Sequence, residues 1–268
     1  MQDFNYHTHT SRCGHADYSM SDEDFVNELV NAGIKKMAFT DHAPEKNLID
    51  TRPRMRMSYD KKHEYLESIR KLREKYKGII DIESGFEVEY LPGDEENLLE
   101  LKSEVDKIIL GQHFIYNSDK SSSRPLKIFR YQTFTHEDLI TYAKYIERAC
   151  EIGLVDIIAH PDLFMLARDE FTYHEEEITR MICSTAEKYK IPLEINLTEP
   201  HFYNHDKIHK ISYPCKDFWK IASDYDIDVL YGIDAHFKSQ IQDYKKDIHF
   251  VEDYLGEETI KKMKLIKK

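Results

Sequence analysis

The sequence predicts an α/β protein built on a parallel β-sheet. Short runs of β-branched or aromatic residues alternate with segments of helical spacing along the whole chain. The joints between them are short, and candidate metal-binding side chains stand just past the ends of most runs. Seven strand–helix alternations of this kind predict a parallel sheet that is either closed as a barrel or open and doubly wound.

Seven runs are predicted to be the strands of this sheet. They are Phe4–His7, Lys36–Thr40, Ile79–Ile82 continued by Gly85–Val88, Lys107–Leu110, Val155–Ala159, Leu193–Asn196 and Val229–Ile233.

Several helices can be delimited from the sequence. Ser21 and Thr135 are each followed by Asp three residues later and are predicted N-caps, although Asp replaces the Glu of the usual capping box. The helices that they begin are predicted to stop at Gly33 and Gly153. An amphipathic stripe predicts another helix over Tyr59–Lys77. The lysine-rich tail from residue 261 onward is interpreted as a solvated helix end.

Composition excludes several classes of protein. The 268 residues carry a formal net charge of −12, which disfavours binding to nucleic acid. Apolar stretches are too short to span a membrane, and we expect no signal peptide. The four cysteines are scattered, which indicates reduced thiols and a cytoplasmic protein. No linker or repeat divides the chain, so we expect one domain over residues 1–268.

Nine potential metal ligands follow the predicted strands. They are His7, His9, His15, His42, Glu87, His113, His160, Asp234 and His236. In a closed parallel barrel all these strand ends meet at one mouth, so their convergence favours the barrel over the open sheet. Imidazoles with carboxylates suit zinc, manganese or iron. Nine ligands are too many for one ion of about four to six contacts. Two or three ions fit better, as in enzymes that hydrolyse phosphoesters.

Seven short motifs resemble those of the PHP (polymerase and histidinol phosphatase) family, in the family's order. They are HTH at 7–9, CGHA at 13–16, FTDHAP at 39–44, GFEVEY at 85–90, GQHF at 111–114, AHPD at 159–162 and GIDAH at 232–236. The resemblance implies a distorted, TIM-like (β/α)7 barrel with a site for three divalent metal ions. It also selects Glu87, as part of G-x-E, and leaves Glu83 and Glu89 as solvated charges.

The family pattern divides the nine ligands among three ions of zinc, manganese or iron. The implied sets are His7, His9, Glu87 and Asp234 for one ion, Glu87, His113 and His160 for a second, and His15, His42 and His236 for the third. Asp17 is an alternative to His15 at the third ion.

The motifs are most similar to those of the histidinol-phosphate phosphatase branch. This branch hydrolyses L-histidinol phosphate to L-histidinol and phosphate in histidine biosynthesis. We therefore expect a small phosphorylated substrate and neither nucleic acid nor membrane as a partner, and we leave a homo-oligomer open. Another small phosphomonoester, phosphotyrosine or a nucleotide is an alternative substrate. A metal-binding regulatory protein without turnover is a third hypothesis.

The hypothesised mechanism is attack on phosphorus by a hydroxide that bridges two metals. Asp162 and Asp41 are both candidates to carry a proton to the leaving group, and the sequence does not choose between them. Arginines in the loops after strands are candidates for the phosphate, with Arg54 and Arg130 put forward first. Tyr116 is a candidate substrate contact at the mouth.

A further run of histidines has helical spacing. His201, His205 and His209 recur every four residues and could hold a metal ion. We interpret this run as a solvated helix face instead.

Overall fold

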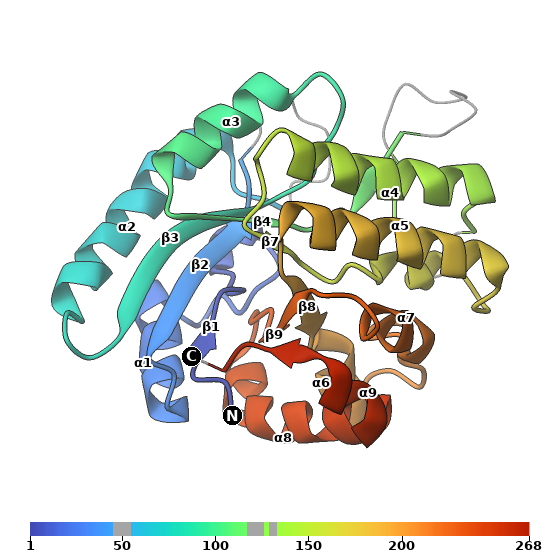
Figure 1. Cartoon of the computed structure of the whole chain (residues 1–268). Helices are drawn as coiled ribbons and strands as arrows, with labels where there is room; N and C mark the ends of the chain where they lie inside the picture. Colours follow the sequence, from blue (N-terminus) through green and yellow to red (C-terminus); the bar gives the residue numbers. More distant parts are fainter. Residues whose placement is uncertain (45–54, 117–125, 129–132, 268) are drawn as a thin grey trace.

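A curled parallel sheet with helices around its outside forms the protein (Figure 1). The computed structural model describes residues 1–44, 55–116, 126–128 and 133–267. Within these ranges the sheet has eight strands in the order β1-β2-β3-β4-β7-β8-β9-β10, and every pair is parallel. Their bounds are β1 Phe4–Asn5, β2 Lys36–His42, β3 Asp81–Val88, β4 Lys107–Leu110, β7 Ile157–Ile158, β8 Leu193–Asn196, β9 Asp228–Gly232 and β10 Lys264–Leu265.

The helices follow the strands in alternation. They are α1 Asp22–Ala32, α2 Lys62–Lys75, α3 Glu95–Glu104, α4 His136–Glu151, α5 Tyr173–Tyr189, α6 Thr198–Asn204, α7 Lys216–Ala222, α8 Lys238–Leu255 and α9 Glu257–Lys262. Short 3-10 turns lie at Ser11–Cys13, Tyr59–Lys61 and Leu163–Ala167. A small antiparallel pair, β5 (Phe114–Ile115) and β6 (Leu126–Lys127), lies outside the main sheet.

Both predicted N-caps are confirmed, and Asp completes the capping box in each helix. The Asp24 carboxylate accepts from the Ser21 backbone N–H at 2.8 Å, and the Asp24 N–H donates to Ser21 Oγ at 3.2 Å. The Thr135 cap of α4 repeats the arrangement. Helix α1 ends as predicted at Gly33, whose φ of 91° is in the left-handed region that glycine tolerates best.

The carboxyl-terminal tail differs from the sequence interpretation. All seven predicted strands are present, but Lys264–Leu265 adds an eighth by pairing with Asp228 and Val229 of β9. Only the segment up to Lys262 is helix. The tail joins the sheet because its apolar residues, among them Met263, pack against the core.

The sheet curls until its two sides meet near the mouth. Thr8, just after β1, forms a parallel bridge with Ala235, just after β9. His9 N–H donates to the Ala235 carbonyl at 3.0 Å, and Ala235 N–H donates to the His7 carbonyl at 3.1 Å. The interior of the curl is filled by a small apolar cluster of Phe4, Ile109, Ile157, Ala159 and Leu230. This closure turns the carboxyl ends of the strands toward one mouth.

Two simpler expectations can be compared with the structure. The four cysteines form no disulfide. Among the described residues, we find no helix with the length and apolar character needed to cross a bilayer. The single domain over residues 1–268 stays a prediction.

Candidate metal centre

Glu87, at the end of β3, is the centre of a histidine cluster at the mouth. Five imidazole nitrogens lie within 3.6 Å of its carboxylate oxygens, namely His42 Nδ1 at 2.9 Å, His160 Nε2 at 3.0 Å, His9 Nε2 at 3.5 Å, His7 Nε2 at 3.6 Å and His113 Nε2 at 3.6 Å. Gly111 leaves room for this carboxylate, because a Cβ there would come within 1.8 Å of Glu87 Oε1. The sequence thus keeps a side chain away from the point where the ligands converge.

Asp234, just past β9, is a second carboxylate shared by imidazoles. Its Oδ1 lies near His9 Nε2 at 3.1 Å, His236 Nδ1 at 3.3 Å and His7 Nε2 at 3.4 Å. Its Oδ2 accepts hydrogen bonds from Asn196 and Thr198. Asp234 and His160 both have positive φ, 50° and 30°, a conformation that costs free energy in residues other than glycine. Strain of this kind is typical of functional sites.

His15 and His236 complete the cluster on the side of β1. Their Nε2 atoms are 2.8 Å apart, and the His236 ring stacks on His9 with centroids 4.1 Å apart. Asp17 is the predicted alternative to His15 at the third ion. Its carboxylate accepts hydrogen bonds from the backbone N–H and the hydroxyl of Ser19. The structure therefore brings His15, and not Asp17, into the cluster.

The unpaired atoms of the cluster provide a test of whether cations fit it. Seven buried nitrogen and oxygen atoms of the cluster lack a hydrogen-bond partner, namely His7 Nε2, both ring nitrogens of His9, His42 Nδ1, His160 Nδ1, Glu87 Oε2 and Asp234 Oδ1. Buried polar groups without partners are uncommon in folded proteins. Divalent ions bound among these atoms would satisfy them, so the donor set fits the ions predicted from the sequence.

The pKa values of the cluster residues also favour bound cations. Burial lowers the pKa of His9, but the nearby carboxylates of Asp234, Asp41 and Glu87 outweigh it and raise the pKa to about 9. Burial lowers the pKa of His15 to about 4, assisted by the neighbouring His236 and His9. Burial raises the pKa of Glu87, yet the surrounding imidazoles hold it well below its usual value. The buried carboxylates therefore require positive charge beside them.

Three more carboxylates lie beside the imidazole nitrogens that face away from Glu87 and Asp234. Glu194 on β8 is 2.8 Å from His7 Nδ1, Glu89 is 3.1 Å from His113 Nδ1, and Asp41 Oδ1 is 3.7 Å from His9 Nδ1. A carboxylate behind a ligating histidine fixes its tautomer and raises its basicity.

Sequence reasoning missed two of these carboxylates. Glu194 was not a candidate, and the expectation that Glu89 is solvated is wrong, because Glu89 is buried between Arg56 and His113. A usable signal existed, because Glu89 is two residues after Glu87 and therefore on the same side of the chain.

The two candidate proton carriers differ in their surroundings. Asp41 is fully buried and accepts from the N–H and hydroxyl of Thr10, which suits it to hold His9 in place. Asp162 accepts from the Cys215 N–H at 2.6 Å and from Trp219 Nε1 at 3.0 Å, while its Oδ1 is buried without a partner. Burial raises the pKa of Asp162 to about 7. Either role stays a prediction.

The candidate substrate contacts are described only in part. Arg54 and Arg130 lie outside the described residues. Tyr116 follows β5 beside Tyr145 of α4, and its contact with substrate stays a prediction. Two other loop arginines are already engaged, because Arg12 binds Asp22 at 2.7 Å and Arg168 binds Glu175 at 2.6 Å.

The predicted solvated face of histidines is confirmed only in part, because His205 and His209 are exposed but His201 is not. Helix α6 ends at Asn204, so His209 lies beyond it. His201 is buried, and its ring bonds Asp247 at 2.9 Å and Ser239 at 3.1 Å, both on α8. His205 is exposed and pairs with Asp243. His201 thus ties two helices together with protein atoms alone.

Fold and site together define a class of protein in which buried imidazoles and carboxylates gather at the mouth of a curled, barrel-like parallel α/β sheet. The family model of the PHP domain matches residues 5–198. The chain belongs to the PHP domain family.

The chain is similar to three proteins whose names mention histidinol phosphatase or histidinol phosphate phosphatase. A Deinococcus radiodurans protein named "Probable histidinol-phosphatase" is 27% identical over 160 residues, which cover 59% of this chain and 59% of that relative. A Listeria monocytogenes structure assigned as a histidinol phosphatase has a TM-score of 0.72 and 21% identity, and the match covers 91% of this chain and 99% of that one. The histidinol phosphate phosphatase of Lactococcus lactis, solved with Zn, L-histidinol and phosphate, has a TM-score of 0.67 and 16% identity over 93% of each chain. The two structures support the barrel-like fold.

Proposed function

We propose that this chain is a metal-dependent phosphomonoester hydrolase that converts L-histidinol phosphate and water to L-histidinol and phosphate. The observation that carries the proposal is the mouth cluster, where five imidazoles surround the Glu87 carboxylate and three lie near that of Asp234. The names of the similar proteins support histidinol phosphate as the substrate.

Nine residues would hold the ions in the three sets given by the family pattern. Bound divalent ions would supply a nucleophilic water at neutral pH and offset charge on the phosphate oxygens. The chain's own part is to hold His7, His9 and His113 in orientation through Glu194, Asp41 and Glu89. Asp162, two residues after His160, is the proposed proton donor to the leaving alkoxide.

The proposal is tested by assaying the metal-replete protein against a panel of phosphomonoesters while its metal content is measured. The panel contains histidinol phosphate, phosphotyrosine, a nucleoside monophosphate and a sugar phosphate. We expect kcat/KM for histidinol phosphate to exceed the others by orders of magnitude. Preference for another ester would move the proposal to that substrate, and no turnover with the mouth fully loaded would overturn it.

A further inference from the structure

Arg56 is a buried arginine beside the mouth that has no part in the proposed reaction. Its side chain is 5% exposed, and its Nη1 lies 3.1 Å from Oε2 of Glu89, whose side chain is 0% exposed. The same nitrogen donates to the Ala43 carbonyl at 3.1 Å. Arg56 thus connects the residue that follows β2 with the residue that follows β3.

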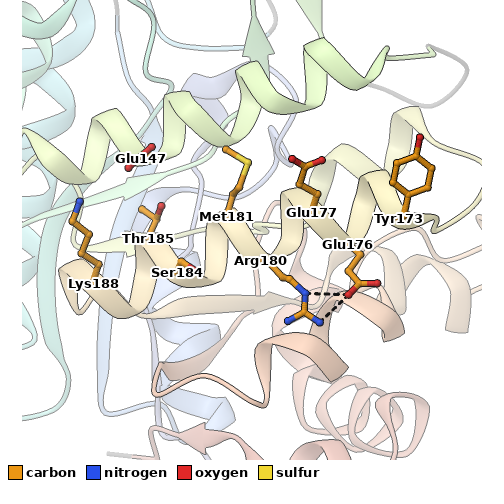
Figure 2. Close-up of a pocket in the computed structure, with 9 residues that line it drawn as sticks. All are labelled: Glu147, Tyr173, Glu176, Glu177, Arg180, Met181, Ser184, Thr185 and Lys188. Carbon is orange, nitrogen blue, oxygen red and sulfur yellow. Dashed lines mark hydrogen bonds and ion pairs between the residues drawn. The ribbon is translucent and has the colours of Figure 1, made fainter.

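Burial distinguishes this ion pair from arginine–glutamate pairs at the surface. Figure 2 shows one such pair on α5, in which Arg180 donates to Glu176 at 3.0 and 2.8 Å. Those two side chains are 53% and 47% exposed, so water solvates both charges whether or not the pair forms. Water cannot reach the Glu89 carboxylate, which depends on the protein groups that contact it. A buried pair of this kind is weak evidence for a stabilising role, so a further role is worth seeking.

Glu89 connects Arg56 to His113, a proposed metal ligand. The second oxygen of Glu89, Oε1, lies 3.1 Å from His113 Nδ1. Because an ionised carboxylate only accepts hydrogen bonds, Nδ1 carries the proton of the neutral ring. The lone pair of Nε2 is then available on the side of Glu87, whose Oε1 is 3.6 Å away. Arg56, Glu89 and His113 thus form a chain of contacts that ends where the ions are proposed to bind.

Arg56 also contacts the residues that follow two of the proposed ligands. Ala43, whose carbonyl accepts from Arg56, comes directly after His42. Phe114, whose ring centroid is 6.0 Å from the guanidinium carbon, comes directly after His113. The family pattern assigns His42 and His113 to different ions. One guanidinium therefore has contacts beside ligands of two proposed ions.

We propose that Arg56 is a positioning residue of the metal centre, which holds the Glu89 carboxylate so that His113 keeps the ring orientation that directs Nε2 to an ion. The ion concerned is the second one, assigned to Glu87, His113 and His160. Arg56 is not itself a ligand, because a guanidinium has no acceptor atom. The proposal rests on the metal-dependent function proposed above.

The test compares the Zn²⁺ affinity of the wild type with that of Arg56→Met, which keeps a long side chain but removes its charge and its donors. Competition with a chelator measures the affinity, and metal content per chain is measured alongside. We expect one of the bound ions to be held about tenfold more weakly, the lower end of the range for lost partners of a ligating histidine. Arg56→Lys can place an ammonium near the position of Nη1, so it should bind Zn²⁺ more tightly than Arg56→Met.

A double-mutant cycle tests whether Arg56 acts through Glu89. Glu89→Gln should weaken the same ion. The double variant Arg56→Met/Glu89→Gln should bind Zn²⁺ no more weakly than Glu89→Gln alone, because the carboxylate that Arg56 holds is already gone. Losses that multiply in the double variant would overturn the proposal, because Arg56 would then act independently of Glu89.

Arg168 offers a matched control, because it also holds a buried glutamate and a backbone carbonyl. It donates to Glu175 at 2.6 Å and to the Phe134 carbonyl at 2.6 Å. The second oxygen of Glu175 accepts from the Thr172 N–H at the start of α5, where Glu89 instead contacts His113. Arg168→Met should lower the midpoint of urea denaturation, as Arg56→Met does, but keep the Zn²⁺ affinity of the wild type.

Zn²⁺ binding by the wild type separates a failure of this proposal from a failure of the proposed function. If the wild type binds Zn²⁺ and Arg56→Met binds it equally well, or if Arg168→Met loses as much affinity, Arg56 is not a positioning residue and the metal centre stands. A wild type that binds no Zn²⁺ would overturn both. Circular dichroism checks that each variant is folded, and Arg56→Gln replaces Arg56→Met, with a loss in the same direction, if the latter does not fold.

Discussion

The protein buries histidines in two ways, and the contrast explains what the mouth is for. On α6, His201 uses one ring nitrogen for Asp247 and the other for Ser239, and Asn204 donates to the second oxygen of Asp247. We call this set the helix bridge. At the mouth, five imidazoles share Glu87, and ring nitrogens of His7 and His9 are left without hydrogen bonds.

The difference lies in what completes each group. The helix bridge is complete with protein atoms, so its contribution is to stability. The mouth has more ligand atoms than the protein can pair, at a cost that a stable fold alone does not explain. Substitutions at the two places should therefore separate metal binding from stability.

The largest effect is expected from Glu87→Gln. The amide keeps the volume beside Gly111 but removes the negative charge that two ion sites are proposed to share. We expect a loss of at least about 10³-fold in kcat/KM, because catalytic ions would be lost or misplaced. Metal content per chain and turnover of histidinol phosphate are the measurements. Wild-type metal content together with wild-type turnover would contradict the account.

The matching change in the helix bridge is His201→Ala. It leaves the Asp247 carboxylate buried with one partner fewer, which should lower the free energy of unfolding by about 3 kcal/mol. Urea denaturation measures the loss. Metal content per chain should remain that of the wild type. If His201→Ala lost metal but kept its free energy of unfolding, the helix bridge would serve metal binding and not stability, which contradicts the account.

A smaller effect on the mouth is expected from Glu194→Gln. Glu194 contacts His7 from behind, so its charge should tune the affinity for metal by about 10- to 100-fold. Competition with a chelator measures this affinity. Glu175→Gln is the control, because Glu175 is also fully buried but pairs with Arg168 away from the mouth. Equal affinities in the two variants would show that Glu194 has no special role.

The smallest effect is expected where the two regions meet. Thr198 is the first residue of α6, and its hydroxyl donates to Asp234 Oδ2 at 3.1 Å. Thr198→Val removes this bond and should cost about 1 kcal/mol or less in the free energy of unfolding. Metal affinity should fall only a few-fold. A loss of bound metal as large as that expected for Glu87→Gln would show that the helix bridge and the mouth are more tightly coupled than their contacts indicate.

Local rules explain what could be predicted from the sequence. Alternating patterns located the seven strands, and the parallel arrangement then placed His7, Glu87 and Asp234 at one mouth, 80 residues or more apart in the chain. For His7 and Asp234 the inference needs only a pattern of a few residues and a general property of parallel sheets. The choice of Glu87 over Glu83 and Glu89 came from the resemblance to the PHP family.

Partners far away in the chain explain what could not be predicted. The spacing of His201, His205 and His209 predicted a shared helix face, but α6 ends at Asn204, and His201 is buried with its ring bonded to Asp247 of α8. Likewise, β10 is two residues long and forms by pairing with β9, more than 30 residues earlier in the chain. No window of neighbouring residues carries this information.

The central claim is that the mouth is built around divalent cations. Anomalous diffraction from crystals grown with Zn²⁺ tests it most directly, because it locates metal without reference to activity. The account predicts anomalous peaks within bonding distance, about 2.0–2.2 Å, of the His7, His9, Glu87 and Asp234 side chains. A map with no peak among these residues, from protein that still turns over its substrate after exhaustive chelation, would contradict it.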